Sequence, residues 1–294
     1  MTMGIDIHVL NFLKFARRKQ AFGRVATIGR QEINVPIDKL KSALNLKGYT
    51  KYGPYCEELL IGHFAATVVE SFDNSDYEHA THIADMNKPL AVQNRYDTVI
   101  DGGCIEHIYN IPQALRNVSE ICSAGGQILH VLPTNNFCGH GFWQVSPELF
   151  FTLYSEANGY RETEVFLADL ANEQFWYQVR EPRDGERANV TSSTPLYALV
   201  RTRRTEVFNH DDVQQSDYDF AWKGNQSDYV FAWKRDQISS PKISKFKELV
   251  TQLAFVPFAK IAYWKWLQFA TPLSPTALSS KNPHLIKIAI SSFV

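Results

Sequence analysis

The segment from Tyr96 to Leu132 reads YDTVIDGGCIEHIYNIPQALRNVSEICSAGGQILHVL, and it decides the fold class. It opens with an apolar, β-branched run that ends at Asp101 before two glycines, and it closes with a second such run, QILHVL, at 127–132. Residues 111–122 between the two runs are predicted to form a helix. Strand, helix and strand in this order are typical of a parallel sheet with helices packed on its faces.

The same alternation extends in both directions along the chain. Predicted strands are 24–29, 66–72, 81–84, 96–101, 127–132, 163–167 and 196–201. Predicted helices are 5–18, 37–44, 54–63, 111–122 and 146–157, the last with Ser146 as N-cap and Pro147 in its first turn. We therefore predict a doubly wound, Rossmann-like α/β fold: a mixed seven-stranded sheet with helices on both faces. The predicted units are an N-terminal helix (1–19), the sheet domain (20–204) and a helical C-terminal extension (205–294).

The C-terminal extension has two unusual features. Residues 215–223 (QSDYDFAWK) recur at 226–234 (QSDYVFAWK) with a period of 11 and eight of nine positions identical. This repeat is either a local duplication or a pair of aromatic anchors for a partner. Residues 242–270 are basic and rich in Trp and Phe, which fits a helix lying in a membrane interface, or a helix packed on its own domain or in a dimer interface. Pro257 is expected to kink or split this stretch.

Composition excludes several classes of protein. The 294 residues carry 30 Lys plus Arg and 31 Asp plus Glu, a net charge of −1, with 45% hydrophobic and 21% charged residues. Such a chain folds and lacks the surplus of cations that nucleic-acid binding needs. The last 53 residues hold seven Lys and one Glu, so the rest of the chain is acidic. Four single cysteines and the absence of an uncharged 18-residue apolar window predict a cytoplasmic protein, with membrane contact at most peripheral.

Polar residues that follow strands are the candidates for a nucleotide-type site, because such ligands bind at the carboxyl ends of parallel strands. Gly29 follows the first predicted strand and allows a close backbone approach. Asp73 follows the second strand, where a carboxylate can accept both hydroxyls of a ribose or can cap the next turn. Asp85 follows the short third strand, and Asp101 ends the fourth.

Taken in order, these pieces resemble class I S-adenosylmethionine-dependent methyltransferases over residues 20–204. The resemblance rests on Asp73, Asp85, the Tyr96-Asp97 to Glu106-His107 stretch and the Gly125-Gly126 turn. It implies S-adenosylmethionine as cofactor, with Asp73 at the ribose, Asp85 and Met86 at the adenine, and Asp101, Gly102 and Gly103 below the methionine moiety. It also implies that the strand at 196–201 runs antiparallel.

The first glycine motif departs from the family pattern. The chain has Gly29-Arg30-Gln31 where the family usually has an acid and two or three glycines. Either Arg30 pairs with the carboxylate of the cofactor, which suits a guanidinium fork, or cofactor binding is weakened or lost.

The loop after the fifth strand, 133–148, is rich in Asn, Gly, His and aromatic residues and is well placed to hold a polar substrate. Methyl transfer to a hydroxyl requires removal of its proton. His140 is the first candidate for that base and His107 the second, although either histidine could instead order its loop. Predicted substrate contacts are Asn135, Asn136, Trp143 and Gln144. His79 and His82 lack a third ligand in the sequence, so no metal is predicted.

Two functions follow from these observations. The first is methyl transfer from S-adenosylmethionine to a small-molecule or carbohydrate-like acceptor. The second is a non-catalytic methyltransferase-like binding or scaffold protein that docks through its C-terminal extension.

Overall fold

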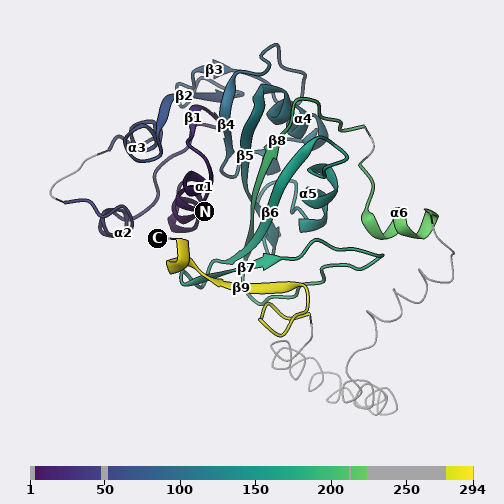
Figure 1. Ribbon diagram of the computed structural model, residues 1–294. Helices are drawn as coiled ribbons and strands as arrows, with labels where there is room; N and C mark the ends of the chain where they lie inside the picture. The colour runs from purple at the N-terminus through teal and green to yellow at the C-terminus, as the bar shows by residue number, and fades with distance from the viewer. Residues whose placement is uncertain (1–3, 48–51, 212, 224–275, 294) are drawn as a thin grey trace.

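The computed structural model describes residues 4–47, 52–211, 213–223 and 276–293. Within these ranges one mixed sheet has the strand order β3-β2-β1-β4-β5-β8-β6-β7-β9 (Figure 1). The strands are β1 Gly23–Ile28, β2 Ala66–Asp73, β3 His82–Ile83, β4 Tyr96–Asp101, β5 Cys122–Asn135, β6 Tyr160–Asp169, β7 Phe175–Val179, β8 Leu196–Arg204 and β9 Leu285–Ala289. The helices are α1 Ile7–Lys19, α2 Ile37–Ala43, α3 Glu57–His63, η1 Ile105–His107, α4 Ile111–Ile121, α5 Pro147–Leu153, α6 Ser216–Lys223 and η3 Ile290–Phe293.

The first half of the sheet is parallel and doubly wound, as predicted. β1 pairs in parallel with both β2 and β4, β2 pairs with β3, and β4 pairs with β5. The order of the strands therefore reverses between β1 and β4. At such a switch point the loops at the carboxyl ends of two neighbouring strands diverge and leave room for a ligand.

The second half is antiparallel and larger than predicted. β8 lies antiparallel between β5 and β6, in agreement with the strand direction that the family resemblance implies. The predicted number of seven strands is wrong, because β7 and β9 extend the sheet to nine. Both additional strands pair in antiparallel fashion, β7 with β6 and β9 with β7.

Two hydrophobic cores cover the two faces of the sheet, as the alternating side chains of buried strands require. In β5, Ile128 and Leu132 point into the core formed with α4 and α5, whereas Leu129 and Val131 point into the core formed with α1, α2 and α3. Figure 1 shows α4 and α5 on one side of the sheet and α1 on the other. α1 is thus part of the sheet domain's core.

The described part of the C-terminal region contains two helices, α6 and η3, and one strand, β9. The first copy of the repeat forms α6 from Ser216, while the second copy and the predicted helices at 242–270 lie outside the described residues. β9 returns to the edge of the sheet, and η3 after it packs on α1, with the rings of Phe15 and Phe293 4.9 Å apart. The domain boundary at residue 204 stays a prediction. Among the described residues, no helix is both long and apolar enough to cross a membrane.

Candidate functional site

Backbone pairing places the predicted cofactor residues side by side at the carboxyl edge of the sheet. The amide of Gly29 donates to the carbonyl of Phe72 at 2.8 Å, next to Asp73. The amide of Ala84, the neighbour of Asp85, donates to the Asp73 carbonyl at 2.7 Å. On the other side of β1, Ile28 is in register with Asp101. The ends of β1, β2, β3 and β4 therefore form one continuous edge at the switch point.

The two acids on the β2–β3 side are ordered by local hydrogen bonds. Asp73 Oδ1 accepts from the amide of Ser75 at 3.0 Å. Asp85 Oδ1 accepts from the backbone and side-chain amides of Asn87 at 3.0 and 2.9 Å, and Asp85 Oδ2 lies 3.1 Å from Lys88 Nζ. The hydrogen bonds from Asn87 and Lys88 lower the pKa of Asp85, so it is a carboxylate at neutral pH. Met86, predicted at the adenine, is buried in the core below this edge.

The loop after β1 is filled by its own side chains. Gly29 has a φ of +72°, and the buried Gln31 side chain folds back to donate from Nε2 to the Ile28 carbonyl at 2.8 Å. A Cβ added to Gly102 would lie 2.4 Å from Gln31 Oε1, so the amide occupies the space beside that glycine. Arg30 Nε pairs with Glu57 at 2.7 Å, and its guanidinium lies over the Tyr55 ring. The structure thus gives Arg30 protein partners on α3 and its flank.

Asp101 is fully buried and anchors the chain that follows β4. Its Oδ1 accepts the amides of Cys104 at 3.1 Å and Ile105 at 3.2 Å. Its Oδ2 lies 2.8 Å from His130 Nδ1, and His130 Nε2 lies 2.7 Å from the hydroxyl of Tyr154. Asp101 therefore orients the β4–η1 turn, which Gly103 enters with a φ of +92°, and the carboxylate faces the protein interior.

Three titratable side chains meet just beyond this turn. Glu106 Oε1 lies 3.2 Å from His140 Nε2 and 3.7 Å from His107 Nε2. Burial, with a smaller contribution from Asp101, raises the pKa of the fully buried Glu106 to about 8. Burial is also the main cause that lowers the pKa of His107 and of His140. At neutral pH both imidazoles are therefore neutral and able to accept a proton. We call Glu106, His107 and His140 the EHH cluster.

The loop after β5 is held against η1 by its backbone. The amides of Phe142 and Trp143 donate to the carbonyl of Glu106 at 2.8 and 3.2 Å. Gly141 has a φ of +68°, and a Cβ there would lie 2.8 Å from the same carbonyl. Only glycine permits this approach, which brings His140 to the Glu106 carboxyl group.

The other predicted substrate residues mainly fix the loop. Asn135 Nδ2 donates to Ser192 Oγ, and Asn136 Nδ2 donates to the carbonyls of Ser192 and Thr194. Gln144 Oε1 accepts the amide of Phe137 at 2.8 Å.

Aromatic side chains border the exposed side of the EHH cluster. Trp143 Nε1 donates to the Ile108 carbonyl at 2.9 Å, while its ring remains partly exposed. Tyr109 and Phe142 are 76% and 69% exposed, and their rings meet edge to face. Exposed rings in this position provide apolar contact area for a ligand next to polar groups.

Sequence reasoning left out three of these residues. The sequence marks Glu106 only as part of the stretch that carries the family resemblance, because its contact with His140 spans 34 residues. Gln31 was noted as a departure from the glycine pattern, and its inward fold has no sequence signal. His130 had one: a histidine inside the otherwise apolar run QILHVL, where a buried imidazole needs hydrogen-bond partners.

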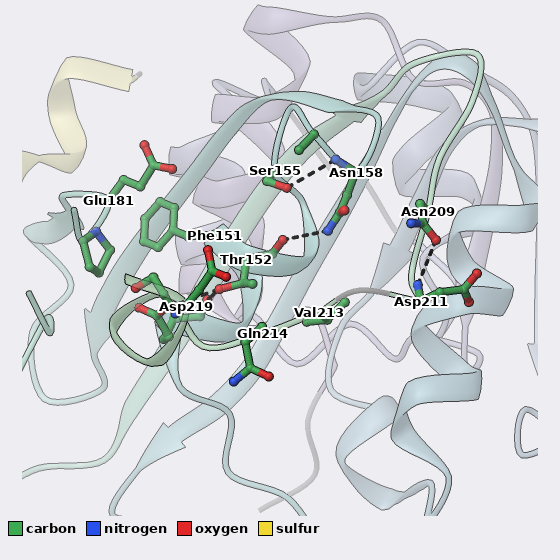
Figure 2. A pocket seen from close by; sticks show the side chains of 14 residues that line it. Phe151, Thr152, Ser155, Asn158, Glu181, Asn209, Asp211, Val213, Gln214 and Asp219 are labelled. Carbon is green, nitrogen blue, oxygen red and sulfur yellow. Dashed lines mark hydrogen bonds between the residues drawn. The ribbon is translucent and has the colours of Figure 1, made fainter. Parts of the chain in front are cut away.

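A cavity of about 830 Å³ lies away from this edge, between α5 and the segment that leads into α6 (Figure 2). Figure 2 shows Asn158 bonded to Thr152 and Ser155, and Asn209 bonded to Asp211. None of the sequence-predicted site residues lines it.

No family model matches the chain, and a search of curated proteins finds no match. Among solved structures, it is similar to the 1,6-didemethyltoxoflavin-N1-methyltransferase of Burkholderia thailandensis, with 12% identity, 68% of this chain and 78% of that chain covered, and a TM-score of 0.37. It is also similar to the N-methyltransferase NodS of Bradyrhizobium japonicum WM9, with 12% identity, 66% and 93% covered, and a TM-score of 0.38. Because the identities and TM-scores are low, the proposal below rests on the strand order and on the side chains at the strand ends.

Proposed function

We propose that the protein transfers a methyl group from S-adenosylmethionine to a small-molecule acceptor. One observation carries this proposal: the switch point of the sheet has the carboxylates of Asp73 and Asp85 on one side and the proton-accepting EHH cluster on the other. Carboxylates at the ends of the second and third strands suit the adenosyl half of the cofactor. A base at the end of the neighbouring strand suits an acceptor that must lose a proton.

The residues fit the two halves of the cofactor differently. Asp73 and Asp85 are accessible acids at one edge and would bind the ribose and the adenine, respectively. The methionine half would lie over Gly29 and Gly102, where the side chain of Gln31 takes the place that bare backbone has in the family pattern. The Gln31 amide, and not Arg30, is therefore the side chain that the methionine half would meet.

When bound, S-adenosylmethionine supplies a sulfonium methyl group, whose bond to sulfur breaks with the electron pair left on sulfur as the bond to the acceptor forms. The protein aligns the acceptor atom and takes up its proton. Burial lowers the pKa of His107 and His140, which keeps their imidazoles neutral and receptive near pH 7. The proton of the acceptor would pass to the EHH cluster, with His140 as the first base and His107 as the second.

The exposed rings favour a flat acceptor. Tyr109, Phe142 and Trp143 lie close to the EHH cluster in sequence and have exposed rings, whereas Asn135 and Asn136 are bonded to the segment before β8 and Gln144 is bonded within its own loop. A hydroxy- or amino-substituted aromatic compound suits this rim better than a freely hydrated sugar, because ring contacts bury apolar area. Such a molecule is the acceptor class that we propose.

Calorimetry with S-adenosylmethionine tests the proposal on the full chain. We expect binding, and we expect Asp73→Ala to weaken it by about 1–3 kcal/mol through the loss of hydrogen bonds to a charged acceptor. The matched control is Asp76→Ala, which removes a neighbouring, highly exposed carboxylate and should leave the affinity unchanged. Absence of heat at millimolar cofactor would end the proposal, and equal affinities of the two variants would place the ribose elsewhere.

Turnover tests the acceptor side. Formation of S-adenosylhomocysteine would be followed with a panel of phenols, aromatic amines and sugars. We expect turnover with an aromatic acceptor and a fall in kcat of about 10²- to 10⁴-fold in His140→Ala, as for loss of a positioned base. An unchanged kcat in that variant would remove the EHH cluster from the reaction.

The position of Gln31 favours a second candidate function. Its amide fills the space beside Gly102, and Arg30 is paired with Glu57. A domain in which this loop fills the position of the cofactor would be a non-catalytic binding or scaffold protein. The same calorimetry separates the two functions, because a scaffold needs no cofactor.

A further inference from the structure

The EHH cluster combines three atoms that commonly bind metal ions. One carboxylate oxygen of Glu106 and one ring nitrogen each of His107 and His140 all lie within 4.8 Å of one another. The rings of the two histidines meet edge to face, with centroids 4.9 Å apart. Two imidazoles and one carboxyl group form a ligand set that divalent transition metals favour, and the carboxyl group would release its proton when the ion binds.

Glu106 supplies a second, independent observation. Its side chain is 0% exposed, and Oε2 has no hydrogen-bond partner among the described residues, while Oε1 faces the two histidines. A buried polar atom without a partner is costly, and such atoms in folded proteins are usually satisfied by a water or an ion. The carboxyl group therefore has unused binding capacity on Oε2, next to the oxygen that faces the two ring nitrogens.

The ligands are held in place before any ion arrives. Glu106 and His107 belong to η1, whose first residues are fixed by Asp101 through the amides of Cys104 and Ile105. His140 belongs to the loop that hydrogen-bonds to the Glu106 carbonyl. Two loops from neighbouring strands are thus hydrogen-bonded to each other at the cluster, so the ligands are preorganised and little free energy is needed to arrange them around an ion.

We propose that Glu106, His107 and His140 bind one divalent transition-metal ion, such as Zn²⁺, Co²⁺, Fe²⁺ or Mn²⁺. His107 is half exposed, and the exposed rings of Tyr109 and Phe142 follow His107 and His140 by two residues each, so an ion at the cluster would be accessible from solvent. In the loaded protein His140 would be a ligand, and the ion would supply Lewis-acid polarisation of the acceptor atom in place of that base. The ion site goes beyond the proposed methyl transfer and does not require the cofactor.

Cobalt binding to the full chain tests this site without any measurement of activity. The protein would be freed of metal with a chelator and titrated with Co²⁺, with visible absorption reporting the ligand field and calorimetry with Zn²⁺ reporting stoichiometry. We expect one ion per chain. Glu106→Gln, His107→Ala and His140→Ala should each weaken binding by at least about 10-fold, because removal of even an outer-shell partner of a metal ligand costs that much.

The control is the double variant His79→Ala/His82→Ala, which removes the other pair of nearby histidines. His79 lies beside Asp76, and His82 faces Glu70 and Tyr96. This variant should bind Co²⁺ as the original protein does. His107→Ala is the decisive member of the series, because its side chain is half exposed and its removal should not affect folding.

Three results would overturn the proposal: no stoichiometric binding at about 100 µM free metal, binding that survives both His107→Ala and His140→Ala, or binding that the control variant abolishes. Calorimetry with S-adenosylmethionine on the metal-free protein is a separate measurement. If cofactor binds and metal does not, the ion site fails while the methyl-transfer proposal and His140 as base stand. If metal binds and cofactor does not, the ion site stands while the methyl-transfer proposal and His140 as its base fail.

Discussion

Replacement of Asp101 with alanine should destabilise the fold far more than the loss of an ordinary carboxylate. Asp101 is 0% exposed and is hydrogen-bonded on both oxygens. The change would leave the amides of Cys104 and Ile105 without their acceptor. It would also leave His130 bonded on one side only, to the hydroxyl of Tyr154. Each of these groups is inside the protein, where water cannot readily replace the lost bond.

The size of the effect follows from these contacts. An unsatisfied buried polar group costs about 1–3 kcal/mol, and the change leaves three such groups: two backbone amides and the His130 ring nitrogen. Since the losses overlap, we expect a decrease of about 3–5 kcal/mol in the free energy of unfolding, a large part of the roughly 5–15 kcal/mol of a typical protein. Asp101→Asn keeps an accepting oxygen for the amides and requires only a tautomer change at His130, so it should cost about 1–2 kcal/mol.

Urea unfolding followed by circular dichroism and tryptophan fluorescence would measure both variants. Asp211→Asn is the matched control. Asp211 pairs with Arg116 at 2.6 Å, but its side chain is 75% exposed, so the loss should stay below about 1 kcal/mol. If Asp101→Ala were no more destabilising than Asp211→Asn, the buried network through His130 and Tyr154 would not support the site as described.

Three further predictions concern the loop after β1, the pH dependence of stability and the thiols. Gln31→Ala should tighten S-adenosylmethionine binding about fivefold, because a hydrogen bond worth about 1 kcal/mol to the Ile28 carbonyl no longer has to be broken; weaker binding in calorimetry would show instead that the contact of the amide with the cofactor is worth more than the bond to Ile28. Burial, and to a smaller extent Arg116, lowers the pKa of His210 to about 4, so between pH 6.5 and 4 the unfolded chain binds a proton that the folded protein does not. The free energy of unfolding should therefore fall as the pH drops from about 6.5 to 4, by less than about 1.4 kcal/mol per pH unit. In His210→Gln the free energy of unfolding, measured by urea unfolding at several pH values in that window, should depend less on pH. An unchanged dependence on pH would contradict the lowered pKa of His210. Cys138 is exposed, whereas burial raises the pKa of Cys56 and Cys122 to about 12, so Cys138→Ser should abolish the fast phase of labelling by a disulfide reagent, and a surviving fast phase would place an accessible thiol elsewhere.

The central sheet could be predicted from the sequence because its signals are local. Runs such as YDTVID and QILHVL are bounded by glycine or proline, and their side chains alternate between two cores, which gives strands of definite length. β7 and β9 were missed because each is short and lies at or near the edge of the sheet. β9 also pairs with a segment more than 100 residues away, so the sequence around Leu285–Ala289 does not indicate which strand it pairs with.

The candidate site was predicted residue by residue but not as a group. His107 and His140 were identified from their positions after strands, whereas the carboxyl group that joins them was not. That contact depends on the close approach of Gly141 to the backbone of Glu106, a tertiary feature with no local pattern. Arg30 shows the opposite case: the sequence leaves open whether its guanidinium pairs with the carboxylate of the cofactor, and in the structure Glu57 and the Tyr55 ring are its partners.

Residues 205–284 connect β8 to β9, and both of these strands are paired within the sheet. The entropy of closing a long loop grows only with the logarithm of its length, so eleven extra residues there cost about 0.1 kcal/mol. The near-identical copies at 215–223 and 226–234 could therefore arise, and could vary in number, at almost no expense to the stability of the sheet. Loss of β9, in contrast, would affect the sheet. A chain shortened before Leu285 would leave the hydrogen-bonding edge of β7 uncovered, and uncovered edges promote edge-to-edge association.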